Sequence, residues 1–228
     1  MADKILVIED DSGFREGLCL YLTSIGYNVV SAPDAFKGME LFISEDPDLI
    51  LLDVMLPGKK GTDLCREIRL SSNVPIIMVT AMVDEEINSL KIGADDFITK
   101  PIDDHEFLNA HIESTLRRAR WTREESNQEI LTVGPLTIDI VGHEVRRNGE
   151  KLSLTPLEFN LLCTLAADPK KVFSREDLLE KVWGYRYKSD TRLVNVHIQR
   201  LRSKIEDDPE DPKLVVTERG VGYKAGAF

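Results

Sequence analysis

The sequence predicts a doubly wound α/β domain built on a five-stranded parallel sheet, followed by a smaller α+β domain. Three observations support this prediction. In the first half, short runs of β-branched or aliphatic residues alternate with segments of helical periodicity. Polar residues follow several of these runs directly. After about residue 129 the pattern changes to short strands and amphipathic helices. Alternating strands and helices are typical of parallel sheets covered by helices.

Five strand-like runs form the expected sheet. They lie at Lys4–Ile8, Tyr27–Ser31, Leu49–Leu52, Pro75–Val79 and Phe97–Thr99. The segments between and after them carry apolar residues at helical spacing, which predicts five helices. Their apolar stripes are Phe14, Leu18, Leu22 and Ile25; Phe36, Met39 and Ile43; Leu64 and Ile68; Ile87 and Leu90; and Leu108, Ile112 and Leu116.

A polar stretch at residues 121–129 is the predicted linker between a domain over residues 1–120 and one over residues 130–228. The second domain begins with alternating strands in Leu131–Ile140 and Glu144–Leu152. A helix is expected from Pro156, because Thr155 is a good N-cap and Glu158 completes a capping box. Further helices are expected from Ser174 and from about Asp190 to Ile205. A hairpin is expected over residues 214–223.

The composition is that of an ordinary globular protein, with 42% hydrophobic and 30% charged residues in 228. No apolar run approaches the length of a membrane span, and the N-terminus does not resemble a signal peptide. A cytoplasmic location without membrane contact is therefore expected. Cys19, Cys65 and Cys163 are scattered, which favours free thiols over a disulfide framework.

The acidic charge of the chain is unevenly distributed. Residues 1–120 carry 22 acidic and 12 basic residues, a net charge of −10, whereas residues 121–228 carry 18 and 17, a net charge of −1. The acidic total taken alone argues against a nucleic acid partner. The stretch 186–204, however, holds six basic residues against the single acid Asp190. A local basic patch matters more for phosphate contact than the net charge does.

Polar residues at the strand ends predict a site for phosphoryl chemistry. Glu9 and Asp10 follow the first strand, Asp53 the third, Thr80 the fourth and Lys100 the fifth. Parallel strands bring these ends to one edge of a sheet, where open α/β sheets bind their ligands. Carboxylates that can hold Mg²⁺, a nucleophilic Asp, a hydroxyl and a cation are the parts needed to accept a phosphoryl group. Any one acid alone would favour a solvated loop residue instead.

The motifs around these residues are similar to the receiver domain of two-component response regulators. They read VIEDD, LLDVMLPGKKG, MVTA and GADDFITKP. In the second half, LTPLEFNLL, VFSREDLLEKVWG, TRLVNVHIQRLRSKIE and TERGVGY resemble the winged-helix effector domain of the OmpR/PhoB subfamily. The resemblance covers the whole chain. It implies a CheY- or flavodoxin-like receiver joined to a winged helix-turn-helix domain that binds double-stranded DNA.

The resemblance assigns a role to each residue of the predicted pocket. Asp53 would accept the phosphoryl group from a sensor histidine kinase, and Lys100 would bind that group. Thr80 and Phe97 would be the switch pair. The Mg²⁺ ligands would be Glu9, Asp10, Asp53 and the backbone carbonyl of Met55. The bond before Pro101 is a candidate cis peptide, which would aim Lys100 inward.

The predicted helix up to Ile205 has the pattern of a DNA-reading helix. Its apolar face consists of Val194, Ile198, Leu201 and Ile205, and its opposite face of Arg192, Asn195, Gln199 and Arg202. The pattern alone fits a solvated amphipathic helix equally well. The resemblance implies base contacts by Asn195, Val196 and Arg200, phosphate contacts by Arg192, His197, Arg202 and Lys204, and a minor-groove contact by Arg219 on the wing. Glu218 beside it is unusual for the family.

The predicted dimerisation face departs from the family pattern. The acidic positions of that face are present as Asp95, Asp96 and Glu106, whereas the matching basic position falls on Ala110 or His111. The helix before it carries Glu86, and like charges across an interface are costly. We therefore expect a homodimer on activation with an atypical interface. The loop Gly184–Ser189 corresponds to the segment thought to touch RNA polymerase in this family.

Two other functions are weighed against a phosphorylation-switched regulator. One is a DNA-binding regulator that works without phosphorylation, which the altered dimer face favours and the intact pocket opposes. The other is an aspartyl-phosphate phosphohydrolase. Such enzymes typically carry a second Asp two residues after the nucleophile, and Met55 stands there. The expectation is a switch that catalyses its own phosphoryl transfer and dephosphorylation, and not a metabolic enzyme.

Overall fold

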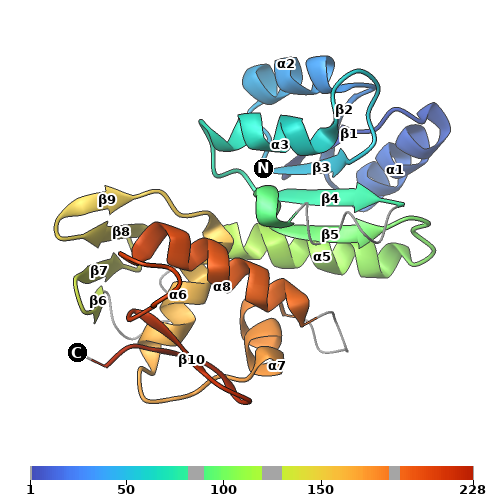
Figure 1. Ribbon diagram of the computed structural model, residues 1–228. Coiled ribbons are helices and arrows are strands. Elements are labelled where there is room, and N and C mark those ends of the chain that lie inside the picture. The colour runs from blue at the N-terminus through green and yellow to red at the C-terminus, as the bar shows by residue number, and fades with distance from the viewer. Residues whose placement is uncertain (1, 82–89, 120–129, 185–190, 228) are drawn as a thin grey trace. The chain divides into compact units, whose positions relative to one another are not determined.

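The computed structural model describes residues 2–81, 90–119, 130–184 and 191–227 and divides the chain into two compact units (Figure 1). The units span Met1–Leu116 and Arg117–Phe228. The predicted linker at residues 121–129 lies outside the described residues. The predicted domain limits at residues 120 and 130 therefore stay predictions.

The N-terminal unit is built on a five-stranded parallel sheet with the order β2-β1-β3-β4-β5, which confirms the predicted fold class. The strands are β1 (Lys4–Ile8), β2 (Asn28–Ala32), β3 (Leu49–Asp53), β4 (Ile76–Thr80) and β5 (Asp96–Thr99). Every residue of β3 and β4 is buried. Central strands of a parallel sheet are covered on both faces, and this explains why their sequences are continuous apolar runs.

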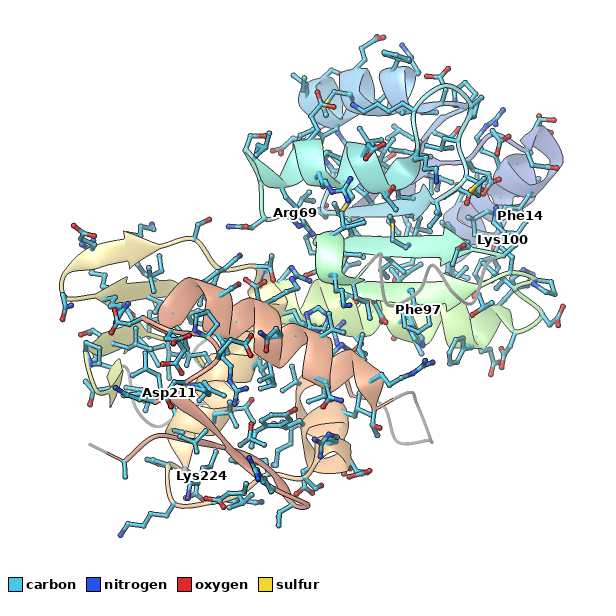
Figure 2. All side chains as sticks on the ribbon, viewed as in Figure 1. Phe14, Arg69, Phe97, Lys100, Asp211 and Lys224 are labelled. Carbon is cyan, nitrogen blue, oxygen red and sulfur yellow. The ribbon has the colours of Figure 1, made fainter. Side chains whose placement is uncertain are left out.

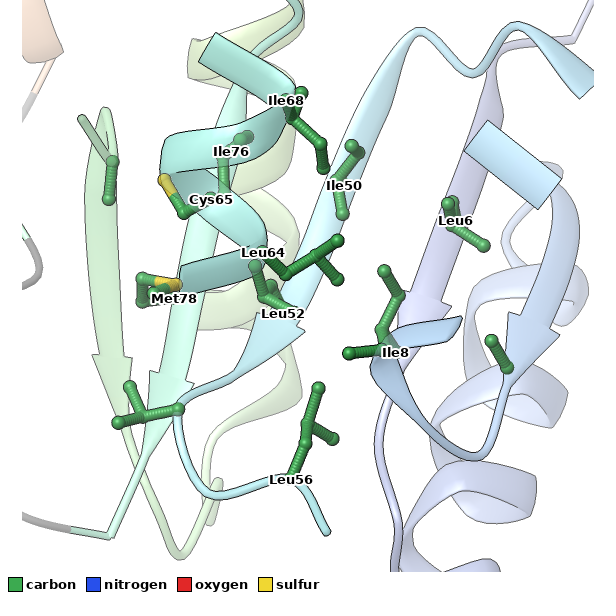
Figure 3. Close-up of a cluster of buried hydrophobic side chains, with 14 residues drawn as sticks. Leu6, Ile8, Ile50, Leu52, Leu56, Leu64, Cys65, Ile68, Ile76 and Met78 are labelled. Atoms are coloured by element: carbon green, nitrogen blue, oxygen red, sulfur yellow. The ribbon is translucent and has the colours of Figure 1, made fainter. Parts of the chain in front are cut away.

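Helices cover both faces of this sheet and create two hydrophobic cores. The described helices are α1 (Ser12–Ser24), α2 (Ala35–Glu45), α3 (Gly61–Arg69) and α5 (His105–Ala119). Leu6, Ile8, Ile50 and Leu52 lie in one core with the buried face of α3 (Figure 3). The alternate strand residues lie in the other core with Phe14, Leu18 and Leu22 of α1 and the apolar stripe of α5. Ile25, which the sequence predicts on the α1 stripe, is 42% exposed, so the prediction is wrong at that position. The predicted fourth helix lies largely within residues 82–89, outside the described residues.

The apolar stripe predicted for α2 is wrong at two positions. Phe36 and Ile43 are each 74% exposed. The helix instead packs through Ala35 and Gly38, both of which are buried. A Cβ on Gly38 would lie 2.7 Å from Ile8 Cδ1, so this helix approaches β1 more closely than a larger residue would allow. Small residues on a close-packed face give little hydrophobic signal in the sequence.

The C-terminal unit combines a four-stranded antiparallel sheet, helices and a hairpin. The sheet has the order β6 (Ile130–Val133), β7 (Leu136–Asp139), β8 (Glu144–Arg147) and β9 (Glu150–Leu152). The turn between β8 and β9 has positive φ at both Asn148 (50°) and Gly149 (89°), as a tight hairpin turn requires. The other elements are α6 (Pro156–Ala167), α7 (Arg175–Leu178), the π-helical turn η2 (Leu179–Trp183), α8 (Arg192–Ile205), β10 (Val215–Glu218) and β11 (Gly222–Ala225).

The start of α6 is determined locally, as the sequence predicts. The backbone N–H of Glu158 donates to Thr155 Oγ1, and the N–H of Thr155 donates to Glu158 Oε2 at 3.0 Å. This reciprocal capping box satisfies two backbone donors that the first helical turn leaves without partners. Pro156 takes the first helical position, where no N–H is needed.

Candidate functional site

The strand ends of the N-terminal unit bring four predicted pocket residues to one edge of the sheet. Glu9 follows β1, Asp53 and Thr80 end β3 and β4, and Lys100 follows β5. The parallel register pairs Ile8 with Leu52 and Asp53 with Val79, so these strands end level with one another. Glu9, Asp53 and Thr80 are buried. The peptide bond between Lys100 and Pro101 is cis.

Lys100 lies between two buried carboxylates. Its Nζ is 2.6 Å from Glu9 Oε2 and 2.8 Å from Asp53 Oδ2. The ammonium group also lies 4.6 Å from the centroid of the Phe14 ring, and Figure 2 shows the two side chains together. Contact with an aromatic face and two carboxylates stabilises the charged form of a lysine. The second Asp53 oxygen, Oδ1, accepts from the Met55 backbone N–H at 3.1 Å.

Three carboxylates of this pocket fit a hard divalent cation. One oxygen each of Glu9, Asp10 and Asp53 lies within 4.8 Å of the other two. Asp10 is exposed, whereas the other two are buried, so the group opens to solvent on one side. Mg²⁺ prefers oxygen ligands and keeps several waters. The donor set and its exposure therefore fit Mg²⁺ bound by protein carboxylates and water.

Burial and neighbouring charge change the proton affinities in the pocket. Burial raises the pKa of Glu9 above its usual value, the hydrogen bond from Lys100 lowers it, and repulsion from Asp53 raises it again. The net pKa of Glu9 is raised. Burial acts to lower the pKa of Lys100, but its hydrogen bonds to Asp53 and Glu9 outweigh this and the net pKa is raised. Lys100 is therefore a permanent cation at neutral pH.

The raised pKa of Glu9 predicts a pH-dependent stability in metal-free protein. An acid whose pKa is raised by folding contributes most below its unfolded pKa, and this contribution is lost as the pH rises through the folded pKa. Glu9→Gln keeps the neutral form at every pH. We expect its stability relative to the wild type to increase from about pH 4.3 upward. Urea unfolding in EDTA between pH 4 and pH 8 measures the difference, and a difference that stays constant would contradict this account.

Gly61 allows the start of α3 to lie against the backbone of Asp53. A Cβ on Gly61 would lie 1.8 Å from the Asp53 carbonyl oxygen, and the N–H of Gly61 donates to Val54 O at 2.9 Å. Gly61→Ala must therefore displace the strand end, and we expect it to destabilise the unit by about 1–3 kcal/mol.

The matched control for Gly61→Ala is Gly17→Ala. Gly17 lies in α1, and a Cβ added to it would have no neighbouring atom within 4 Å. The added methyl group should stabilise the unit by about 0.5–1 kcal/mol, because Ala favours helix more than Gly does. Thermal unfolding of both variants tests the pair. Equal effects would contradict the steric argument.

In the C-terminal unit, α8 presents a polar outward face. Arg192, Asn195 and Gln199 are exposed at helical spacing, and Arg219 is exposed at the turn of the β10–β11 hairpin. Glu218 beside it forms an ion pair with Lys224 across the hairpin. These positions form an outward polar face, and the individual DNA contacts stay predictions.

Arg202 does not lie on the outward face, so this expectation is wrong. Its side chain is buried, with Nε and Nη2 donating to Val215 O at 3.0 and 2.7 Å and Nη2 donating to Thr217 Oγ1 at 2.7 Å. Burial lowers the pKa of its guanidinium below the usual value. Arg202 thus joins α8 to β10. A sequence shows the charge of such a residue but not the carbonyl groups that accept its hydrogen bonds.

The other predicted DNA contacts have partners within the unit. His197 is buried with its ring 5.4 Å from that of Trp183. Arg200 and Lys204 both form ion pairs with the buried carboxylate of Glu158. Val196 is buried as well. These residues stay predicted contacts. The segment Gly184–Ser189 lies outside the described residues after Gly184.

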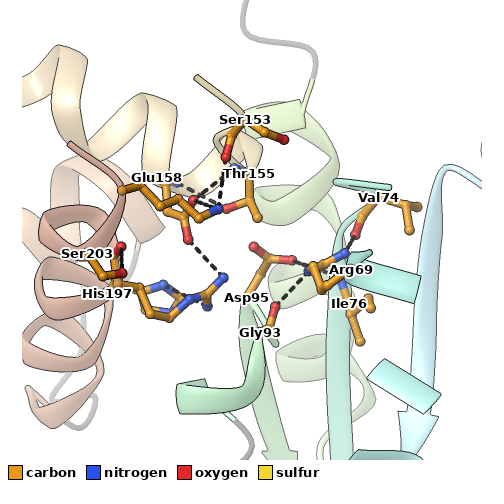
Figure 4. Close-up of polar contacts among 12 residues, drawn as sticks. Arg69, Val74, Ile76, Gly93, Asp95, Ser153, Thr155, Glu158, His197 and Ser203 are labelled. Carbon is orange, nitrogen blue, oxygen red and sulfur yellow. Dashed lines mark hydrogen bonds and ion pairs between the residues drawn. The ribbon is translucent and has the colours of Figure 1, made fainter. Parts of the chain in front are cut away.

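Two acids of the predicted dimerisation face have partners within the N-terminal unit. Asp95 Oδ2 lies 2.7 Å from Arg69 Nη2 and accepts from the Ile76 N–H at 2.9 Å (Figure 4). Asp96 Oδ2 lies 2.8 Å from Nδ1 of His111. The position of Glu86 lies outside the described residues. Asp95 is thus occupied by a cation from α3, which the sequence pattern did not indicate.

Comparisons with known proteins agree on both units. Residues 5–112 match the family described as response regulator receiver domain, and residues 149–225 match the family described as transcriptional regulatory protein, C terminal. The chain is 47% identical to the DNA-binding response regulator MtrA of Mycolicibacterium smegmatis, with 99% of this chain and 98% of that protein covered.

Two further likenesses extend over almost the whole chain. The probable transcriptional regulator ycf27 of Porphyridium aerugineum is 45% identical, with 97% of this chain and 95% of that protein covered. The solved structure of a RitR mutant matches with a TM-score of 0.78 at 31% identity, covering 98% of this chain and 99% of that one. Within the described residues, each helix is too short or too polar to cross a bilayer.

Proposed function

The chain belongs to the OmpR/PhoB-type response regulators, and on this basis we propose that a sensor histidine kinase phosphorylates Asp53 and that phosphorylation controls DNA binding by the C-terminal unit. It is a two-component transcriptional regulator and not an enzyme of metabolism. The observation that carries the proposal is the position of the Asp53 carboxylate. It is buried at the end of a central strand, 2.8 Å from a lysine and within 4.8 Å of two further acids.

Glu9, Asp10 and Asp53 would hold Mg²⁺, together with the carbonyl of Met55. The bound ion supplies charge neutralisation at the acceptor carboxylate. Lys100 holds Asp53 Oδ2 in place and offers a cation to the incoming phosphoryl oxygens. The same arrangement supports phosphoryl transfer to Asp53 by the receiver itself and the slow hydrolysis of the aspartyl phosphate to Asp53 and inorganic phosphate.

The metal assignment predicts a thermal shift. Mg²⁺ at about 100 times its Kd should stabilise the wild type by about 2.7 kcal/mol. Asp10→Asn should lose this gain, because it removes an exposed ligand without disturbing the buried pair that Lys100 bridges. Melting curves with Mg²⁺ or EDTA measure the difference. A full Mg²⁺ response in Asp10→Asn would contradict the assignment.

Phosphorylation would act through the edge of the sheet. A phosphoryl group adds about −1.5 to −2 charges and three acceptor oxygens. Thr80, buried at the end of β4, is the proposed donor to those oxygens, and half-buried Phe97 on the neighbouring strand is its proposed switch partner. The structural change would then extend to β5 and α5, and the activated protein would form a homodimer.

The dimer is proposed to use contacts other than the usual ion pairs. Asp95 and Asp96 are already engaged within their own unit by Arg69 and His111. A cation from a second copy would therefore have to share a buried carboxylate with an existing partner. This observation favours an atypical dimer interface. The proposed dimer would form in the cytoplasm, and its two C-terminal units would bind two DNA half-sites. Contact of Gly184–Ser189 with RNA polymerase is part of the same proposal.

The test is to load the full chain with Mg²⁺ and beryllofluoride, a phosphoryl mimic, and to measure molar mass and DNA affinity. Doubling of the mass and tighter DNA binding that both require Asp53 are the expected results, with Asp53→Ala as the comparison. No change in either quantity would favour the alternative, a regulator that binds DNA without phosphorylation.

A further inference from the structure

The side-chain amide of Asn195 is held in one orientation by two hydrogen-bond donors. Arg175 Nε and Tyr223 Oη each lie 2.8 Å from Asn195 Oδ1. The Nε of arginine can only donate, so the atom that it contacts must be the carbonyl oxygen of the amide. Two donors occupy both lone pairs of that oxygen.

Tyr223 is itself fixed by its strand. The backbone of Tyr223 exchanges two hydrogen bonds with Phe173, at 2.8 and 2.9 Å. A Cβ on Gly222 would lie 1.9 Å from Phe173 O, so only glycine permits this close approach. The Tyr223 ring also contacts the guanidinium groups of Arg175 and Arg202, at 5.2 and 5.7 Å. The hydroxyl group that contacts Asn195 is therefore held before any ligand binds.

The backbone of Arg175 is held in place as well. It is the first residue of α7, which begins with a capping box between Ser174 and Asp177. Arg175 and Asn195 are 20 positions apart along the chain, and Asn195 and Tyr223 are 28 positions apart. Asn195 is thus oriented by α7 and by the hairpin, although its own backbone belongs to α8.

The free end of the amide can only donate. Asn195 is exposed on the outward face of α8. Among residues 2–81, 90–119, 130–184 and 191–227, its Nδ2 has no hydrogen-bond partner, whereas its oxygen has two. A bidentate contact with adenine needs both a free carbonyl for N6 and a free N–H for N7. Because two donors already occupy its carbonyl oxygen, Asn195 cannot accept a hydrogen bond from adenine N6.

We propose that Asn195 reads a base edge that offers acceptors, N7 and O6 of guanine or O4 of thymine. Cytosine offers only a donor, and adenine places an N6 donor, for which the amide has no free acceptor, beside its N7, so both are disfavoured. The inference rests on the proposed DNA-binding function and specifies the chemistry of one contact. Arg175 and Tyr223 are positioning residues for this contact, since they act through the amide of Asn195. A good base contact discriminates by roughly 10-fold or more against the wrong base.

The experiment selects binding sequences from a randomised DNA duplex library with the full chain loaded with Mg²⁺ and beryllofluoride. The wild type, Asn195→Ala and Tyr223→Phe are compared, and Tyr21→Phe is the matched control. Tyr21 also loses a hydroxyl hydrogen bond, but to His105 O in the N-terminal unit. Individual duplexes with each base at the affected position then give the affinity ratios.

We expect one position of the selected motif to lose its preference in Asn195→Ala. In the wild type and in Tyr21→Phe that position should hold guanine or thymine, favoured roughly 10-fold over adenine. In Tyr223→Phe the ratio should fall several-fold, because the Asn195 oxygen regains a lone pair that can accept from adenine N6.

Three results would overturn the inference. They are adenine or cytosine at that position in the wild type, no position that depends on Asn195, or an unchanged ratio in Tyr223→Phe. Failure of the proposed function looks different. In that case the wild type and Tyr21→Phe would enrich no sequence at all, and this result would overturn the inference together with the function on which it rests.

Discussion

Asp53→Asn is expected to abolish stable phosphorylation of the chain by a small-molecule phosphodonor in the presence of Mg²⁺. The amide keeps the size of the side chain but cannot act as the carboxylate nucleophile. It also removes one of the three carboxylates that would hold the ion. The expected result is loss of the phosphorylated species to the limit of detection, with the fold unchanged. Intact-mass spectrometry under acidic conditions measures the occupancy directly.

Asp103→Asn is the matched control for this prediction. Asp103 follows β5 at the same edge of the sheet, but its side chain is exposed. It should be phosphorylated like the wild type. Equal occupancy in Asp53→Asn and the wild type would show that another residue is the acceptor, and the proposed pocket would then be wrong.

Glu158→Ala is expected to destabilise the C-terminal unit by about 3–5 kcal/mol. The Glu158 carboxylate is fully buried, and Figure 4 shows it beside Thr155. Its Oε1 lies 2.9 Å from Arg200 Nη2 and its Oε2 lies 2.7 Å from Lys204 Nζ. Removing it leaves both cations without this partner, and it also removes half of the capping box at Thr155, worth about 1 kcal/mol.

Two comparisons separate the parts of this effect. Glu158→Gln keeps the shape of the side chain and an oxygen for the Thr155 N–H but removes the charge, so it should cost less than Glu158→Ala. Glu150→Gln changes an exposed acid on β9 and should stay within about 0.5 kcal/mol of the wild type. Hydrogen exchange of α6 and α8 amides in the full chain measures all three. A Glu158→Ala variant as stable as Glu150→Gln would contradict the buried ion-pair account.

The pocket of the N-terminal unit was predictable because its parts are local. Each polar residue directly follows a strand, and the strands are recognisable as apolar runs. A parallel sheet then brings their ends together whatever the details of packing. Asp53, Lys100 and Glu9 were found in this way, and the capping box of α6 was found from four consecutive residues. The resemblance to response regulators supplied the roles, which spacing alone does not give.

The residues that the sequence misplaced depend on contacts between distant segments. Phe36 and Ile43 have the spacing of a buried stripe, but α2 packs on β1 through Gly38 instead. Arg202 has the spacing of an outward residue, but carbonyl and hydroxyl oxygens of β10 hold it inside. In both cases the spacing was correct, but the position of the neighbouring element decided which face is buried.

By itself, then, the sequence determined the α/β class of the first unit, the edge at which its carboxylates meet and the helix that faces outward in the second. These follow from periodicity and from residues adjacent along the chain. Only the tertiary structure decided that Arg69 holds Asp95, that Glu158 holds Arg200 and Lys204, and that Arg175 and Tyr223 orient Asn195. Each of these contacts joins residues at least 20 positions apart. The strength of such a contact depends on the distance and direction between two side chains, and the order of residues does not specify either.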